Sequence, residues 1–276
     1  METKEIERAL ITRYRNKLYR PFIKALKHYE MLKENDVIGV CISGGKDSLT
    51  LAKLFQELSR FSDFPITVKY LVMNPGFNEE NLTQLKLNAK SLGIPIIIKD
   101  SDVFKVAYNH GGNNPCYLCA RMRRGFLYEF AKEQGCNKIA LGHHFNDVIE
   151  TTMLNVLYAG CYKTMLPKLQ SQNFPGMELI RPMVFIFEKD IVNFMKYIGI
   201  EAMSCGCKIA SGQLDSKRKE IKALIAEMKL KNKEVEKNIY RSSENVHVDT
   251  VLGWKKSGKR HHFLDEYEQI KDDNSE

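Results

Sequence analysis

A short glycine-rich turn gives the clearest indication of chemical function in the chain. It reads Ser43-Gly44-Gly45-Lys46-Asp47-Ser48 and directly follows the apolar run Val37–Ile42. Adjacent glycines let backbone N–H groups approach an anion closely, because no Cβ intervenes. A helix that starts here adds free amides and its positive dipole end, and Lys46 adds a mobile charge. The turn therefore predicts a phosphate site. It lacks the dinucleotide fingerprint and the longer Walker loop, so a pyrophosphate fits it better than a whole triphosphate.

A pair of closely spaced cysteines predicts a second kind of chemistry. Cys116 and Cys119 are separated by two residues at the start of a predicted helix. Thiolates at this spacing can both reach one metal ion or cluster. Two cysteines leave a tetrahedral site incomplete, and Cys205-Gly206-Cys207 is the obvious source of a further ligand. The spacing alone leaves a redox dithiol and half of a zinc site open as alternatives.

A third motif combines histidine and aspartate. Gly142 and His143 stand at the end of a predicted strand, and Asp147 follows four residues after His143, at a helix start. A neutral imidazole can bond a phosphate or an adenylated oxygen, and a carboxylate can hold Mg²⁺. We therefore expect His143 and Asp147 to face one crevice.

Strands and helices alternate around these motifs. Strands are predicted over 37–42, 66–73, 94–98 and 138–141, and helices over 49–58, 78–92, 121–134 and 147–158. Short β-branched runs that alternate with helices are typical of an α/β fold with a parallel twisted sheet and helices on both faces. Ligands of such folds bind at the carboxyl ends of the strands. The glycine turn and the histidine motif both fall at such ends.

The remaining segments divide the chain into three parts. We expect basic amphipathic helices over 1–34, the α/β catalytic domain over 35–212, and a basic helical segment with a polar tail over 213–276. Within these parts the sequence predicts a long connection over 159–182, helices over 188–197 and 217–238, and loose order from about 240. Cys41 and Cys136 are isolated and are expected to be packed residues.

Composition limits the classes of protein that the chain can belong to. Its 276 residues are 43% hydrophobic and 28% charged, which excludes a wholly disordered chain. No apolar run reaches the roughly 18 residues of a membrane span, and the charged N-terminus lacks a signal core, so we expect a cytoplasmic protein. The net charge is +8, and residues 217–262 hold 13 Lys/Arg against 6 Asp/Glu. This favours a polyanionic partner such as a nucleic acid.

Several blocks resemble one enzyme family. The glycine turn resembles the PP-loop motif of the N-type ATP pyrophosphatases. Three further blocks are similar to those of the tRNA 2-thiocytidine synthetases within that superfamily: PCYLCARMRRG (115–125), KIALGHHFNDVIET (138–151) and NVLYAGCYKTMLPKL (155–169). The resemblance also extends to Arg181-Pro182 and Glu188-Lys189-Asp190-Ile191. It covers roughly residues 15–230.

The resemblance implies an ATP-dependent tRNA sulfurtransferase. Such an enzyme adenylates cytidine 32 and replaces its O2 with sulfur, using ATP, Mg²⁺ and a [4Fe-4S] cluster held by three cysteines. Here those cysteines would be Cys116, Cys119 and Cys207, with Cys205 as the alternate third ligand. The implied partners are tRNA, a sulfur donor (a cysteine desulfurase or inorganic sulfide) and a second copy of the chain, with no membrane.

The resemblance also assigns individual residues. ATP would contact Ser43, Gly44, Gly45, Lys46, Asp47, Ser48, Met73, Gly142 and His143. The catalytic residues would be Lys46, Asp47, Asp147, Cys116 and Cys119. RNA phosphates would meet Arg121, Arg123, Arg124, Lys163, Lys168 and Arg218.

Two alternatives stay open at this point. The first is another PP-loop tRNA-modifying enzyme of the 2-thiouridine synthetase or lysidine synthase type. The former often carries extra terminal zinc pairs, which this sequence lacks, and the latter does not need the cysteine trio. The second is a non-catalytic iron–sulfur RNA-binding protein, which would not turn ATP over to AMP in the presence of tRNA.

Overall fold

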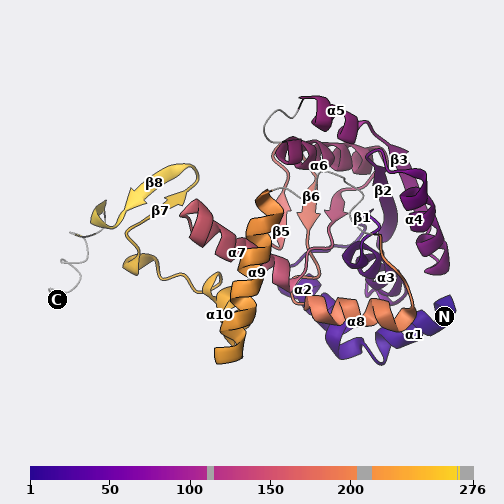
Figure 1. Cartoon of the computed structure of the whole chain (residues 1–276), viewed down its shortest axis with the longest axis horizontal. Helices are drawn as coiled ribbons and strands as arrows, with labels where there is room; N and C mark the ends of the chain where they lie inside the picture. Colours follow the sequence, from indigo (N-terminus) through magenta and orange to yellow (C-terminus); the bar gives the residue numbers. More distant parts are fainter. Residues whose placement is uncertain (111–114, 204–212, 266, 268–276) are drawn as a thin grey trace.

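A six-stranded sheet forms the centre of the computed structural model, which describes residues 1–110, 115–203, 213–265 and 267 (Figure 1). The strand order is β3-β2-β1-β4-β6-β5. The strands are β1 (Val37–Ile42), β2 (Thr67–Asn74), β3 (Ile96–Asp100), β4 (Lys138–Ala140), β5 (Lys168–Gln170) and β6 (Glu178–Ile180). All neighbours pair parallel except β5, which runs antiparallel to β6 at one edge. The expected parallel α/β sheet is therefore confirmed, with one antiparallel edge strand.

Side chains of β1 alternate between two cores, one on each face of the sheet. Ile38, Val40 and Ile42 belong to the larger core, whereas Cys41 lies in the smaller one. A strand that is buried on both faces must be apolar throughout, which explains why its sequence pattern was easy to recognise. From β1 the chain continues to β2 and β3 on one side of the sheet, and then returns to β4 on the other side of β1. Ligands of α/β folds bind in the crevice at such a switch point, here between β1 and β4.

Helices cover both faces, as expected. The larger core holds residues of α3 (Lys46–Phe61), α4 (Glu79–Ser91), α7 (Phe145–Ala159) and α8 (Glu188–Ile198). The smaller core is closed by α6 (Pro115–Glu133) through Tyr128, Phe130 and Ala131. The short helix α5 (Val103–His110) precedes α6 and was not predicted.

The N-terminal helices belong to the same core. They are α1 (Thr3–Ile11), a five-residue π-helix (Arg15–Tyr19) and α2 (Arg20–His28). Leu10, Leu18 and Phe22 are fully buried in the larger core. The predicted basic helices thus carry an apolar face that packs on the α/β body. The division after residue 34 stays a prediction.

Two later segments differ from expectation. The predicted connection over 159–182 contains β5 and β6, whose three-residue strands are held by backbone pairing rather than by a strong apolar pattern. The single helix predicted over 217–238 is two helices, α9 (Gln213–Lys231) and α10 (Val235–Ser242), because Asn232 accepts a hydrogen bond from the Glu234 backbone and turns the chain.

The region from about 240, for which loose order was expected, includes regular elements within its described part, whereas positions 266 and 268–276 of that prediction lie outside the described residues. The described part forms a two-stranded hairpin from β7 (Gly253–Lys256) and β8 (Lys259–His262), between short 3-10 turns at Val248–Thr250 and Phe263–Asp265. In Figure 1 this hairpin stands apart from the sheet. None of the helices in the described part of the chain is long and apolar enough to cross a membrane.

Candidate active site

The glycine turn wraps around a buried serine hydroxyl at the start of α3. The Ser48 Oγ accepts from the Ser43 backbone N–H at 3.2 Å and donates to the Gly45 carbonyl at 2.9 Å. Gly44 has φ +83°, a conformation that L side chains rarely adopt. The first turn of α3 follows at once, so its orphan amides lie beside the turn. The predicted phosphate site therefore has the local geometry that its chemistry requires.

Met203 lies against the glycine turn. Its backbone N–H donates to the Gly44 carbonyl at 3.1 Å, and a Cβ added to Gly44 would stand 2.6 Å from its sulfur. Met203 is the last residue before the segment that carries Cys205 and Cys207, both of which lie outside the described residues. The last described residue before that segment is therefore attached to the glycine turn.

Lys46 bridges two carboxylates. Its Nζ lies 3.0 Å from Asp47 Oδ2 and 3.2 Å from Glu188 Oε1, and Lys222 of α9 also bonds Glu188. Burial opposes the charge on Lys46, but the two carboxylates outweigh it and raise the pKa of the ammonium. Burial likewise opposes ionisation of Glu188, yet Lys222 and Lys46 lower its pKa to about 2. The lysine is thus held charged at the first residue of α3.

The loop after β4 approaches the same helix start. A Cβ added to Gly142 would lie 3.0 Å from the backbone carbon of Asp47, so only glycine permits this contact. His144 and Asp147 cap α7 reciprocally: Asp147 N–H donates to His144 Nδ1 at 3.3 Å, and His144 N–H donates to Asp147 Oδ2 at 2.9 Å. Asp47 Oδ1 is buried without a hydrogen-bond partner among the described residues, 3.7 Å from His144 Nε2. An unsatisfied carboxylate oxygen here calls for a ligand.

His143 is held neutral by its surroundings. Burial and the neighbouring Arg181 guanidinium lower the pKa of His143 to about 4. Arg181 Nε donates to His143 Nδ1 at 3.2 Å, which leaves the proton of the neutral ring on Nε2. Burial and Arg124 lower the pKa of Arg181 itself to about 10. His143 can therefore act as a hydrogen-bond donor at neutral pH.

Arg218 of α9 reaches the start of α7. Its guanidinium lies 3.8 Å from Asp147 Oδ1 and 3.3 Å from Glu150 Oε2. Burial raises the pKa of Glu150 despite this arginine. Arg218 was expected to meet RNA, but in the free protein it is engaged with these two carboxylates.

Apart from Cys161, which is exposed, the described cysteines fall into two groups. The backbone of Cys116 and Cys119 lies in the first turns of α6, and Cys119 is partly exposed. Helix α6 leads into β4 at the amino edge of the sheet, so it begins at the carboxyl edge, where the glycine turn lies. Cys41 and Cys136 are packed as expected, and burial raises the pKa of their thiols to about 12 and about 11. Groups of three or more His, Cys, Asp or Glu side chains that could hold a metal ion are absent from the described part of the chain.

The predicted RNA contacts occupy different environments. Arg121, Arg124 and Lys163 are exposed. Arg123 lies over the ring of Phe104 at 4.9 Å. Lys168 donates to the Glu30 carbonyl at 2.7 Å and thus holds β5 to the segment after α2. Exposure leaves the first three available for RNA, whereas Lys168 already has a partner within the protein.

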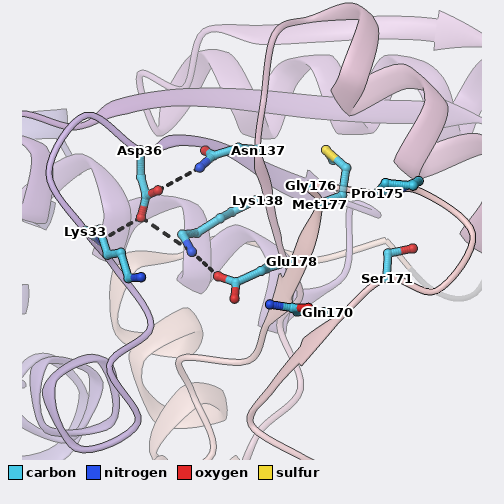
Figure 2. A pocket seen from close by; sticks show the side chains of 10 residues that line it. All are labelled: Lys33, Asp36, Asn137, Lys138, Gln170, Ser171, Pro175, Gly176, Met177 and Glu178. Carbon is cyan, nitrogen blue, oxygen red and sulfur yellow. Dashed lines mark hydrogen bonds and ion pairs between the residues drawn. The ribbon is translucent and has the colours of Figure 1, made fainter.

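A second polar cluster lies at the opposite, amino edge of the sheet (Figure 2). Lys138 is buried between Asp36 and Glu178, and Asp36 also accepts from the Asn137 amide at 2.7 Å. These residues line a pocket of about 480 Å³. No sequence motif pointed to it, and all the charged groups at its floor have partners.

Sequence reasoning missed three neighbours of the site. Arg181 and Glu188 stand in a recognised block but received no role, and Met203 carried no signal. All three reach the site through contacts between residues far apart in the chain, which spacing does not reveal. Met73, expected to contact ATP, is buried near the end of β2, and its role stays a prediction.

Comparisons with known proteins agree with this geometry. Residues 14–204 match the PP-loop domain family. The tRNA-cytidine(32) 2-sulfurtransferase of Pelobacter propionicus is 34% identical over 231 residues, which cover 83% of this chain and 85% of the relative. The enzyme of the same name from Photobacterium profundum is 36% identical, covering 83% and 76%.

A solved structure shares the fold. The U34-tRNA thiolase NcsA from Methanococcus maripaludis, solved with its [4Fe-4S] cluster, superposes with a TM-score of 0.64 at 20% identity, covering 82% of this chain and 77% of that one. From the PP-loop match and the relatives in sequence, this chain belongs to the PP-loop family and, within it, to the tRNA-cytidine(32) 2-sulfurtransferases.

Proposed function

We propose that the protein uses ATP to activate cytidine 32 of tRNA and replaces its O2 with sulfur. One observation carries the proposal: the start of α6, which carries Cys116 and Cys119, and Met203, which precedes the segment of Cys205 and Cys207, both lie at the edge of the sheet that bears the glycine turn. Helix α6 begins at the carboxyl edge, and Met203 is hydrogen-bonded to Gly44. The relatives named above act on cytidine 32, which supports the choice of base.

The first step would be adenylation of the base. The cytidine O2 attacks the α-phosphorus, the bond to the bridging oxygen breaks, and pyrophosphate leaves. Backbone amides at the start of α3 and the ammonium of Lys46 would stabilise the charge that develops on the phosphates. His143, neutral and with its proton on Nε2, would donate to an oxygen of the reacting group without adding a charge.

The second step would replace the activated oxygen. A sulfur nucleophile adds at C2 of the base, and AMP leaves with the original oxygen. A cluster held by Cys116, Cys119 and Cys207 would, when bound, supply an iron that is open to sulfur. The backbone positions of Cys116 and Cys119, one helical turn apart, fit a shared ligand.

Mg²⁺ is the other group that the reaction would need. Asp47 would hold it through the buried oxygen that lacks a partner, together with the carboxylate of Asp147. Magnesium is usually bound by one or two carboxylates together with substrate phosphates, so this donor set fits. The ion would neutralise phosphate charge during adenylation.

Partner assignments belong to the same proposal. Exposed Arg121, Arg124 and Lys163 would contact tRNA phosphates. The sulfur donor would be a cysteine desulfurase or inorganic sulfide, and the enzyme would act as a homodimer. Light scattering of the purified protein and thiolation assays with each donor test these points separately.

The decisive experiment uses a single cysteine variant. Cys116→Ala should abolish cluster colour and 2-thiocytidine formation, measured by mass spectrometry of tRNA nucleosides, while circular dichroism shows an intact fold. Cys161→Ala is the matched control, because Cys161 is exposed and isolated. A colourless wild-type protein that still thiolates tRNA anaerobically with chelator would contradict the cluster, and 2-thiouridine in the product would contradict the base.

A further inference from the structure

The C-terminal hairpin of β7 and β8 concentrates positive charge on two short strands. Lys255, Lys256, Lys259 and Arg260 are all exposed, and residues 253–262 include no Asp or Glu. The turn residues Ser257 and Gly258 both have positive φ, the geometry of the favoured two-residue hairpin turn. The matched PP-loop region ends at residue 204, so it does not include this element.

Strand pairing sets these cations directly against one another. Lys255 pairs with Arg260, and Lys256 with Lys259. Like charges opposite each other destabilise a strand pair, and an isolated two-stranded hairpin is marginal in water. Among the described residues, no hydrogen bond or ion pair joins these strands to the α/β body. An external anion would remove the repulsion.

The hairpin also presents an aromatic pair. Trp254 and His261 are cross-strand neighbours, stacked with centroids 5.3 Å apart and an interplanar angle of 10°. Cationic side chains that alternate with partly exposed aromatic rings are typical of RNA-binding surfaces. The cations bind phosphates, and bases can stack on the rings. Acidic residues become frequent from Asp265 onward, so an anion must approach the strands and not the tail.

We propose that this hairpin is an RNA-binding arm. It binds the phosphate backbone of the tRNA substrate at a place distant from the reacting nucleotide. The inference rests on the proposed function for the identity of the RNA. Because the arm touches only phosphates and stacked bases, it contributes to tRNA affinity and not to the chemical step.

The chain offers a built-in probe of the arm. Trp254 is its only tryptophan, so tryptophan fluorescence reports on the hairpin alone. Titration of the full-length protein with unmodified tRNA should change Trp254 emission, and added salt should reverse the change. Emission that stays constant while filter binding shows tRNA bound would overturn the proposal. Emission that depends on protein concentration without RNA would assign the hairpin to a second copy of the chain and also overturn it.

A charge-neutral variant tests the energetic role. Changing Lys255, Lys256, Lys259 and Arg260 together to Gln should weaken tRNA binding roughly 10- to 100-fold at low salt and flatten the salt dependence by about 3 in the log–log slope. KM for tRNA should rise while kcat at saturation stays constant. The hairpin should persist, because the like-charge repulsion is gone, and near-UV circular dichroism of Trp254 checks this.

A matched control removes the same charge elsewhere. Lys86, Lys90, Lys132 and Lys196, all exposed, changed to Gln should leave the affinity within about threefold. If both variants lost tRNA affinity equally, net charge alone would explain the binding and the proposal of an RNA-binding arm would be wrong. The two proposals fail separately: absent thiolation with a normal Trp254 response breaks the proposed function, whereas normal thiolation with a silent Trp254 breaks the arm.

Discussion

At the carboxyl edge of the sheet Lys46 bridges Asp47 and Glu188, and at the amino edge Lys138 bridges Asp36 and Glu178. The two triads have the same composition but different surroundings. The Lys138 side chain is 4% exposed, whereas that of Lys46 is 30% exposed at the start of a helix.

The two edges differ in whether their carboxylates are fully hydrogen-bonded, and this difference separates a structural cluster from a candidate ligand site. At the amino edge Asp36 has bonds from the Lys33 backbone and the Asn137 amide besides Lys138, so the network is closed although it lines a pocket (Figure 2). At the carboxyl edge one oxygen of Asp47 remains without a hydrogen bond. A buried carboxylate oxygen without a hydrogen bond, beside the free amides of a helix start, distinguishes the carboxyl edge from the amino edge, although the pocket lies at the amino edge.

The largest expected effect comes from removing each central lysine. Lys46→Met should slow ATP–pyrophosphate exchange with tRNA by roughly 10²–10³-fold, because a donor to the phosphates is lost. Its stability should change by less than about 1 kcal/mol, since the pair is partly exposed. Lys138→Met should instead cost about 3–5 kcal/mol of unfolding free energy, because the buried carboxylate of Asp36 and the partly buried one of Glu178 lose the cation between them.

Urea unfolding and exchange assays on both lysine variants measure this contrast. Lys138→Met should keep the kcat of wild type in its folded fraction. Adding Glu178→Gln to it should restore part of the stability, as coupled neighbours do. If the two single variants lost activity and stability in equal proportion, the two edges would not differ as described.

A smaller effect is expected from alanine substitution of two glycines, and it distinguishes the cost of backbone strain from a loss of ATP binding. Gly44 and Gly176 both have φ near +80°, but only Gly44 lies at the glycine turn and would meet Met203. Alanine at either position should cost about 1–2 kcal/mol of stability. Only Gly44→Ala should also weaken ATP binding, by ~10-fold or more, equal to about 1.4 kcal/mol, in equilibrium dialysis. ATP affinity that drops equally in Gly176→Ala would remove the distinction.

The smallest expected effect is a shift in pH dependence. The folded pKa of His143 is lowered to about 4, so its neutral form contributes stability that is complete above pH 6.5 and is lost as the pH falls through 4. Arg181→Gln removes part of the cause and should raise that pKa, so the loss of stability below pH 6.5 should end at a higher pH and be smaller in total. Arg181→Lys keeps the charge and serves as control. Side-chain ¹⁵N NMR measures the titration, and a wild-type midpoint between 6 and 7 would contradict the assignment.

Strong local patterns made part of the fold predictable from sequence. Val37–Ile42 was placed to the residue, because a strand buried on both faces is apolar throughout. β5 and β6 were missed because three residues cannot show a period, and their pairing depends on partners elsewhere in the sheet. The break at Asn232 was missed because one bond from a backbone N–H to a side-chain oxygen, within a charged helical pattern, leaves little trace in composition.

In the candidate site, too, features set by local sequence were predictable, and features set by contacts between distant residues were not. The glycine turn was predictable because its function requires unusual residues at adjacent positions. His143 was identified, but the charge state of its ring depends on Arg181, which lies 38 residues away in sequence. Met203 and Glu188 were invisible as partners for the same reason, since each meets the turn only in the folded chain.

The packing of the first helices constrains how the chain can be synthesised. Tyr14 donates to the carbonyl of Asn193, 179 residues later, and its ring packs on Phe194. At about 5–20 residues per second, a ribosome delivers that partner roughly ten to forty seconds after Tyr14. During this interval the apolar stripe of the nascent N-terminus can meet α3, where Phe22 packs on Phe55, but not α8. The end of the chain that is made first therefore completes its docking late.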